Sequence, residues 1–177
     1  QMLMTLHIRF SRSHGAHPAL DGAAASCCLR TTTTTINMSL TIQSQNKVFE
    51  GVLTKYSFRS KVLGGLEAKM NVFLPESANA GHKVPVLYFL SGLTCTEDNA
   101  AQKGHFFEAA AKEQLAIVFP DTSPRGANIP GEEDSWDFGT GAGFYVKAPQ
   151  EPWKRYYNME DHVVKDLPQL VASEPIP

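Results

Sequence analysis

Alternating apolar and polar positions mark the first regular elements along the chain. Residues 48–59 mix β-branched and aromatic residues in near alternation, and residues 67–74 alternate again. A period of two is typical of a half-buried strand. Gly64 and Gly65 stand between the two segments and provide a turn signal. The pattern therefore predicts an antiparallel hairpin over residues 48–74.

Two shorter runs are apolar on both faces, which suits central strands that helices cover on both sides. They are residues 84–90, VPVLYFL, and residues 115–119, LAIVF. Residues 99–113 between them have a helical period, with Asp98 or Asn99 as the expected cap. The positions of this helix expected to face inward are Phe106, Phe107, Ala110 and Ala111. A strand–helix–strand unit predicts that the two strands are parallel.

The last third of the chain begins with a long loop and ends with a helical pattern. Residues 120–152 are rich in Gly, Pro and acids, and a long ordered loop in a compact domain is usually functional. Residues 156–171 have a helical period, and we expect Pro168 to kink or break that helix. Its expected buried face is Met159, Val163, Leu167 and Leu170. A hairpin followed by a βαβ unit predicts an α/β fold with a doubly wound sheet.

The first 37 residues differ from the rest of the chain. Residues 1–37 have no sustained period, an Ala-rich stretch and a run of five threonines. They carry net charge +2, which leaves −4 for the remainder. We expect a disordered low-complexity extension over residues 1–37, followed by one domain over residues 38–177, with Met38 as the natural start. An organelle transit peptide, rich in Arg and Ser and poor in acids, is the less favoured alternative.

Composition excludes several classes of function. The 177 residues are 42% hydrophobic and 19% charged, as in an ordinary globular domain. A net charge of −2 argues against a nucleic-acid partner, and no apolar run approaches the roughly 20 residues that span a bilayer. Cys27, Cys28 and Cys95 have neither a disulfide-framework nor a zinc spacing, so we expect no metal site and a reducing compartment.

Three stretches together resemble one family. They are residues 90–97 (LSGLTCTE), 120–126 (PDTSPRG) and 135–145 (SWDFGTGAGFY). In this order they are similar to the S-formylglutathione hydrolases, also called esterase D, from about residue 46 to residue 170. The resemblance implies an α/β-hydrolase fold and a serine esterase that converts S-formylglutathione to glutathione and formate with a Ser-His-Asp triad. It also implies no metal or organic cofactor, a cytosolic location and, often, a homodimer.

The same resemblance suggests candidate site residues. It makes the N–H of Leu93 the first oxyanion donor, with Gly92 allowing a close approach of the backbone. Spacing alone would favour an ordinary strand-to-helix turn at this point. Cys95 either borders the active site or is a buried, inert thiol. Arg125 either meets a glutathione carboxylate or forms a structural ion pair, for which Asp121 is one candidate.

The glycine-rich stretch is a second candidate region. Residues 139–143 read GTGAG, but Phe144 stands where a G-x-G-x-x-G phosphate loop needs its third glycine. We interpret it as a turn packed by aromatic side chains near the pocket. Trp136 is the candidate pocket-lining residue among them.

A nucleophile elbow, G-x-S-x-G, is absent from the printed sequence; Ser91, for example, has Phe89 and Leu93 two positions away on either side. We therefore expect the α/β-hydrolase domain to be truncated before the elbow, with no catalytic residue of the triad in this chain. We also expect no esterase activity from the chain alone and an unpaired apolar strand edge. The alternative that stays open is a catalytically inactive binding or interaction protein.

Overall fold

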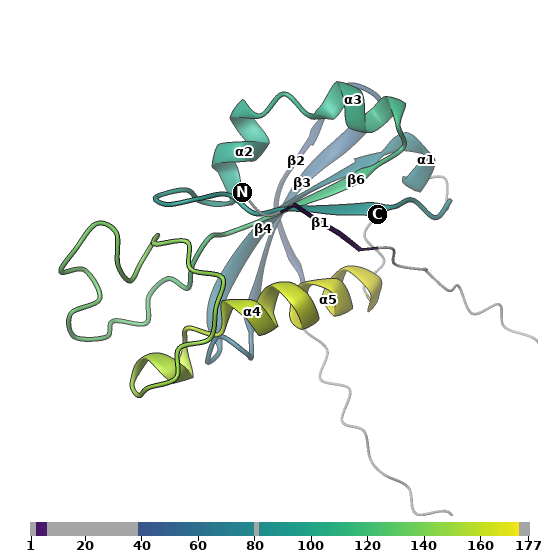
Figure 1. The fold of residues 1–177 in the computed structure, drawn as a ribbon. Coiled ribbons are helices and arrows are strands. Elements are labelled where there is room, and N and C mark those ends of the chain that lie inside the picture. The colour runs from purple at the N-terminus through teal and green to yellow at the C-terminus, as the bar shows by residue number, and fades with distance from the viewer. Residues whose placement is uncertain (1–2, 7–38, 80–81, 174–177) are drawn as a thin grey trace, which may run out of the picture.

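A computed structural model describes residues 3–6, 39–79 and 82–173 (Figure 1). Its centre is a six-stranded sheet with the order β1-β5-β6-β4-β3-β2. The strands are β1 (Leu3–Leu6), β2 (Thr41–Lys47), β3 (Gly51–Ser60), β4 (Leu66–Pro75), β5 (Val86–Phe89) and β6 (Ala116–Pro120). Every pair of neighbours is antiparallel except β5 and β6, which are parallel.

Helices cover both faces of this sheet, which confirms the predicted α/β class (Figure 1). On one face lie α2 (Glu97–Lys103) and α3 (Phe107–Lys112); α1 (Glu76–Asn79) follows β4 directly. The other face carries α4 (Met159–Asp161), a π-helical turn (His162–Asp166) and α5 (Leu167–Ser173), preceded by the 3-10 turn Trp153–Arg155. Each face has its own buried cluster of apolar side chains. No helix within the described ranges is long and apolar enough to cross a membrane.

The predicted hairpin and βαβ unit are both confirmed. Strands β3 and β4 pair from Gly51↔Pro75 to Ser60↔Leu66, and the turn between them has Gly64 and Gly65 at positive φ. Strands β5 and β6 pair in parallel, as the crossover requires. In β4 the burial alternates from Glu67 to Met70, as the sequence pattern predicts, and most of the remaining positions of that strand are buried.

The single helix predicted over residues 99–113 is wrong in two respects. Its cap is Thr96, whose hydroxyl accepts from the Asp98 N–H in a capping box with Asn99. The helix also breaks after Gly104, where a Cβ atom would lie 2.0 Å from the Phe106 ring. The break lets Phe106 reach the ring of Phe89, 4.9 Å away between centroids. The four inward positions are confirmed, with Phe107 and Ala110 buried and Phe106 and Ala111 partly buried in the same cluster.

The second predicted helix continues through Pro168 instead of breaking there. The four positions of its predicted inner face are all buried. Immediately before the proline the helix widens into the π turn, in which the Leu167 N–H bonds to the carbonyl of His162. A prolyl ring clashes with the carbonyl four residues back and lacks an N–H, so one wider turn accommodates it without ending the helix.

Two strands of the sheet, β1 and β2, were not predicted from the sequence. Strand β2 is exposed at every position, so it has no buried face to create an apolar alternation. Strand β1 lies in the segment for which no element was predicted, and four residues are too few to establish a period. It pairs with β5 from Leu3↔Phe89 to Leu6↔Val86, so β5 is not an edge strand of this sheet. The remainder of the predicted disordered extension, residues 7–37, lies outside the described residues.

Candidate functional site

The loop after β5 is exposed and has an unusual backbone. Gly92 and Leu93 are exposed, and the Cys95 N–H closes a turn onto the Gly92 carbonyl at 3.2 Å. Thr94 has φ 62°, a left-handed conformation that is a genuine outlier for a β-branched residue. Such strain persists only where the surroundings impose it, and it clusters at functional sites. None of the described residues accepts a hydrogen bond from the Leu93 N–H.

The glycine-rich stretch packs against this loop. The Thr94 N–H donates to the Gly141 carbonyl at 2.7 Å, and the Tyr145 hydroxyl donates to the Ser91 carbonyl at 2.7 Å. Burial raises the pKa of Tyr145, which keeps this hydroxyl a donor at neutral pH. Gly143 lies against the peptide between Gly92 and Leu93. Residues 135–145, the third of the three family stretches, therefore support the loop in residues 90–97, the first stretch.

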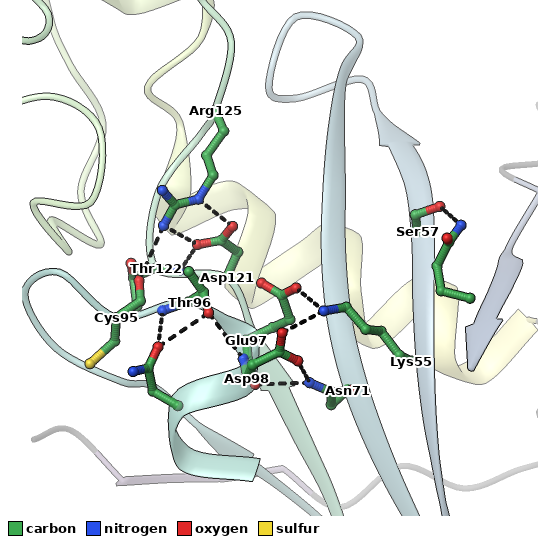
Figure 2. Close-up of polar contacts among 12 residues, drawn as sticks. Lys55, Ser57, Asn71, Cys95, Thr96, Glu97, Asp98, Asp121, Thr122 and Arg125 are labelled. Atoms are coloured by element: carbon green, nitrogen blue, oxygen red, sulfur yellow. Dashed lines mark hydrogen bonds and ion pairs between the residues drawn. The ribbon is translucent and has the colours of Figure 1, made fainter. Parts of the chain in front are cut away.

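The stretch after β6 holds the loop from another side (Figure 2). Arg125 binds both carboxylate oxygens of Asp121, at 2.7 and 3.0 Å, and its Nη2 also donates to the Cys95 carbonyl at 3.2 Å. The hydrogen bond with Asp121 raises the pKa of Arg125. Thr122 Oγ1 donates to the same Cys95 carbonyl, and Ser123 Oγ accepts from the Gly141 N–H at 2.6 Å. All three stretches are thus joined by direct hydrogen bonds.

A charged cluster fixes the start of α2 just beyond the loop (Figure 2). Lys55 Nζ on β3 lies 2.7 Å from Glu97 Oε1 and 2.6 Å from Asp98 Oδ2. Asn71 on β4 donates to the Glu97 carbonyl and to Asp98 Oδ1. Burial opposes ionisation of both Lys55 and Asp98, but their mutual contacts outweigh it, raising the pKa of Lys55 and lowering that of Asp98. Two neighbouring strands thereby anchor the helix that follows the loop.

An apolar cavity of about 230 Å³ adjoins the glycine-rich stretch. Its aromatic walls come from Phe138, Phe144, Trp153 and Tyr157. Trp153 packs edge-on against both Phe138 and Tyr157 at 5.0 Å between ring centroids. This cavity can take a small apolar group but offers little polar recognition. Among the residues described, no group of three or more His, Cys, Asp or Glu side chains is placed to hold a metal ion.

A Ser-His-Asp set exists elsewhere, and its geometry excludes a catalytic triad. Ser60 Oγ lies 3.2 Å from His162 Nδ1 and 2.7 Å from Asp166 Oδ2, and His162 Nδ1 is 3.5 Å from the same Asp166 oxygen. A triad needs the serine and the carboxylate on opposite ring nitrogens, whereas here both face Nδ1. All three residues are buried, with Ser60 at 0% exposure, so no substrate reaches the hydroxyl.

Comparison with known proteins decides the family. The family model described as "Putative esterase" matches residues 60–175, which include the loop, the Arg125 stretch and the glycine-rich stretch. The chain belongs to this esterase family. The chain is 52% identical over 134 residues to the S-formylglutathione hydrolase of Bos taurus, and the match covers 76% of this chain and 47% of that protein. It is 49% identical over 127 residues to that of Arabidopsis thaliana, covering 72% and 44%.

A solved structure gives the same relationship for this chain. An S-formylglutathione hydrolase from Agrobacterium tumefaciens superposes with a TM-score of 0.69 at 42% identity, covering 73% of this chain and 46% of that chain. The resemblance derived from the three stretches is therefore confirmed. The chain spans about half the length of the curated relatives it matches.

The structure brings most of the predicted site residues together. Gly92, Leu93 and Cys95 share one turn, and Arg125 contacts its backbone. The thiol-bearing residue Cys95 is a partly buried free cysteine. Arg125 adopts the structural ion pair that was the alternative to a substrate carboxylate. Trp136 is 72% exposed and does not line the aromatic cavity, so its place in a substrate pocket stays a prediction.

Several residues that shape the site had no clear sequence signal. A Cβ atom added at Gly92 would meet nothing within 4 Å, so the close approach expected at Gly92 stays a prediction, whereas Gly143 is crowded by the peptide between Gly92 and Leu93. Gly139, Gly141 and Gly143 all have positive φ, and their spacing at every second position is a signal that sequence reasoning could have used. Lys55 and Asn71 belong to strands far away in sequence, and nothing in the linear pattern connects them with α2.

Proposed function

We propose that this chain is the amino-terminal part of a cytoplasmic S-formylglutathione hydrolase, a serine-type thioesterase without a cofactor. The reaction is hydrolysis of S-formylglutathione to glutathione and formate, a step in formaldehyde removal. One observation supports it above the others. The Leu93 N–H, which donates to no described residue, lies on a strained turn after β5, and both other family stretches hold that turn by hydrogen bonds.

The chemistry of thioester hydrolysis explains why such a turn is needed. Attack on the thioester carbonyl creates a tetrahedral oxyanion, and backbone N–H groups that are already in place stabilise it. In α/β-hydrolases one donor lies on the loop after the third strand and the other follows the nucleophile. The exposed Leu93 N–H fits the first of these roles. Fixing its position in advance means that no reorganisation accompanies the reaction.

We further propose that the chain by itself does not catalyse the reaction. The printed sequence has no G-x-S-x-G, and Ser60, the only serine found beside a His and an Asp in the described part, is inaccessible. The nucleophile, its base and its acid would then come from the other half of the family length. Removal of a triad typically leaves only the residual rate that binding and the oxyanion hole provide.

The test compares two purified proteins from one gene, the 177-residue chain and the complete translated product. Hydrolysis of S-formylglutathione is followed by loss of thioester absorbance, with p-nitrophenyl acetate as a simple ester. We expect hydrolysis by the complete product, with a preference for the thioester, and none by the chain. A chain that hydrolyses the thioester at the same rate refutes the second proposal. A complete product that cleaves only other esters refutes the first, and one that cleaves neither favours a binding protein.

A further inference from the structure

The peptide between Gly92 and Leu93 is in contact with Gly143. A Cβ atom at Gly143 would lie 3.2 Å from the Gly92 carbonyl carbon, 3.3 Å from the Leu93 nitrogen and 3.4 Å from the Gly92 oxygen. These are the atoms of the peptide that carries the exposed N–H. Gly143 also has φ +73°, a conformation that glycine adopts freely. Only a residue without a side chain fits against this peptide without displacing it.

The neighbours of Gly143 hold the two ends of the same turn. Gly141 accepts the Thr94 N–H after the peptide, and Tyr145 donates to the Ser91 carbonyl before it. Gly141 is itself fixed, since its own N–H donates to Ser123 Oγ at 2.6 Å. Contacts therefore exist before, at and after the peptide, all from the segment 141–145.

The turn needs this external support. Thr94 is β-branched and has φ 62°, which a free loop would relax by rotating the backbone. Rotation there would redirect the Leu93–Thr94 and Thr94–Cys95 peptides, and through the Leu93 Cα it would disturb the next peptide, Gly92–Leu93, which carries the Leu93 N–H. The turn contributes one internal hydrogen bond of its own, between the Cys95 N–H and the Gly92 carbonyl.

We propose that Gly143 is a positioning residue, which sets the orientation of the Gly92–Leu93 peptide and hence the direction of the Leu93 N–H. The proposal rests on the function proposed above, in which that N–H binds the oxyanion. It assigns the glycine-rich stretch a mechanical role in the site. A side chain at Gly143 pushes the peptide by a few tenths of an ångström, without removing any group that contacts substrate.

Gly143→Ala in the complete gene product is the test variant, and Gly65→Ala is its matched control. Gly65 has φ +82°, so alanine meets the same backbone cost, but nothing lies within 4 Å of its added Cβ atom. Because a misplaced donor acts mainly on the transition state, we expect Gly143→Ala to lower kcat about 10- to 100-fold. We expect KM to change less than about threefold, since ground-state binding is retained. Gly65→Ala should keep the wild-type kcat, and equal kcat values for the two variants overturn the proposal.

A second measurement separates this proposal from the function on which it rests. In 15N-labelled 177-residue chain, Gly143→Ala should shift the amide resonances of Leu93 and Thr94, and Gly65→Ala should leave both unchanged. If the wild-type complete product hydrolyses no thioester, the proposed function fails, and the amide shifts alone decide whether Gly143 orients the peptide. Unchanged Leu93 and Thr94 amides in Gly143→Ala overturn the positioning role, whatever the enzyme does.

Discussion

Ser60→Ala removes the hydroxyl that joins the β3–β4 hairpin to the helix beneath the sheet. The hydroxyl donates to Asp166 at 2.7 Å and lies 3.2 Å from His162 Nδ1, in a place where Ser60 is 0% and Asp166 7% exposed. A hydrogen bond to a charged group contributes about 1.5–3 kcal/mol, and water does not readily replace this one. We therefore expect the free energy of unfolding to fall by about 2 kcal/mol near neutral pH. For a domain of this size the melting temperature should fall by about 4–8 °C.

The effect should depend on pH with a defined sign. Burial disfavours the charged form of Asp166, but hydrogen bonds from His162 and Ser60 and the charge of Lys61 outweigh it and lower its pKa. A carboxylate with a lowered folded-state pKa stabilises the fold above its unfolded pKa of about 3.9 and loses that contribution as the pH falls through the folded value. Without Ser60 the pKa returns toward the unfolded value. The wild type should therefore exceed Ser60→Ala in free energy of unfolding by the full amount above about pH 5, and this difference should become smaller below about pH 4.

Ser57→Ala supplies the matched control on the same strand. Ser57 is also buried, but its hydroxyl accepts from the neutral amide of Gln43 at 2.8 Å (Figure 2). We expect the free energy of unfolding to fall by about 1 kcal/mol, by the same amount at every pH. Urea unfolding at several pH values, followed by circular dichroism, gives the free energies. A Ser60→Ala effect below about 0.5 kcal/mol, or one as independent of pH as that of Ser57→Ala, would refute a charge-assisted hydrogen bond to Asp166.

Two further substitutions test the supports of the loop. Lys55→Ala removes the cation that lies 2.7 Å from the Glu97 carboxylate, whose side chain is only 5% exposed. The free energy of unfolding in urea should fall by about 3 kcal/mol. Lys112→Ala, which breaks an exposed pair, should leave the unfolding midpoint unchanged, and equal effects would contradict the reasoning. Tyr145→Phe removes the hydrogen bond to the Ser91 carbonyl and should cost about 1 kcal/mol. It should also speed hydrogen exchange of the loop amides, and unaltered exchange would show that this bond does not hold the loop.

Most of the sheet could be predicted because burial leaves a pattern in the sequence. The β3–β4 hairpin alternates, and β5 and β6 are apolar runs between turn signals. Strand β2 could not be found in this way, since its backbone pairs with β3 while every side chain is exposed. The break at Gly104 and the π turn before Pro168 depend on tertiary packing and on local backbone accommodation, which periodicity does not report.

The site was less predictable than the fold for a physical reason. Resemblance pointed to the three stretches, but most of the bonds that join them use backbone carbonyls as acceptors, those of Ser91, Cys95 and Gly141. The exception is Ser123 Oγ, which accepts from the Gly141 N–H. A carbonyl is the same in every residue type, so no side-chain pattern marks it. Residue identity enters at the side-chain donors Thr122, Arg125 and Tyr145 and at the acceptor Ser123, and for these the sequence left the choice of partner open.

The origin of these contacts bears on how catalysis would be shared along the chain. The turn that presents the Leu93 N–H is fixed by Cys95 carbonyl contacts, by the segment 141–145 and by the anchored start of α2, all within the described residues. An oxyanion donor is effective when its direction is set before the reaction. If Leu93 is that donor, and if the nucleophile lies in the other half of the family length as proposed above, the contacts that set the direction of the donor are already present in this chain. That half would then have to place a hydroxyl at reacting distance from a site whose geometry already exists.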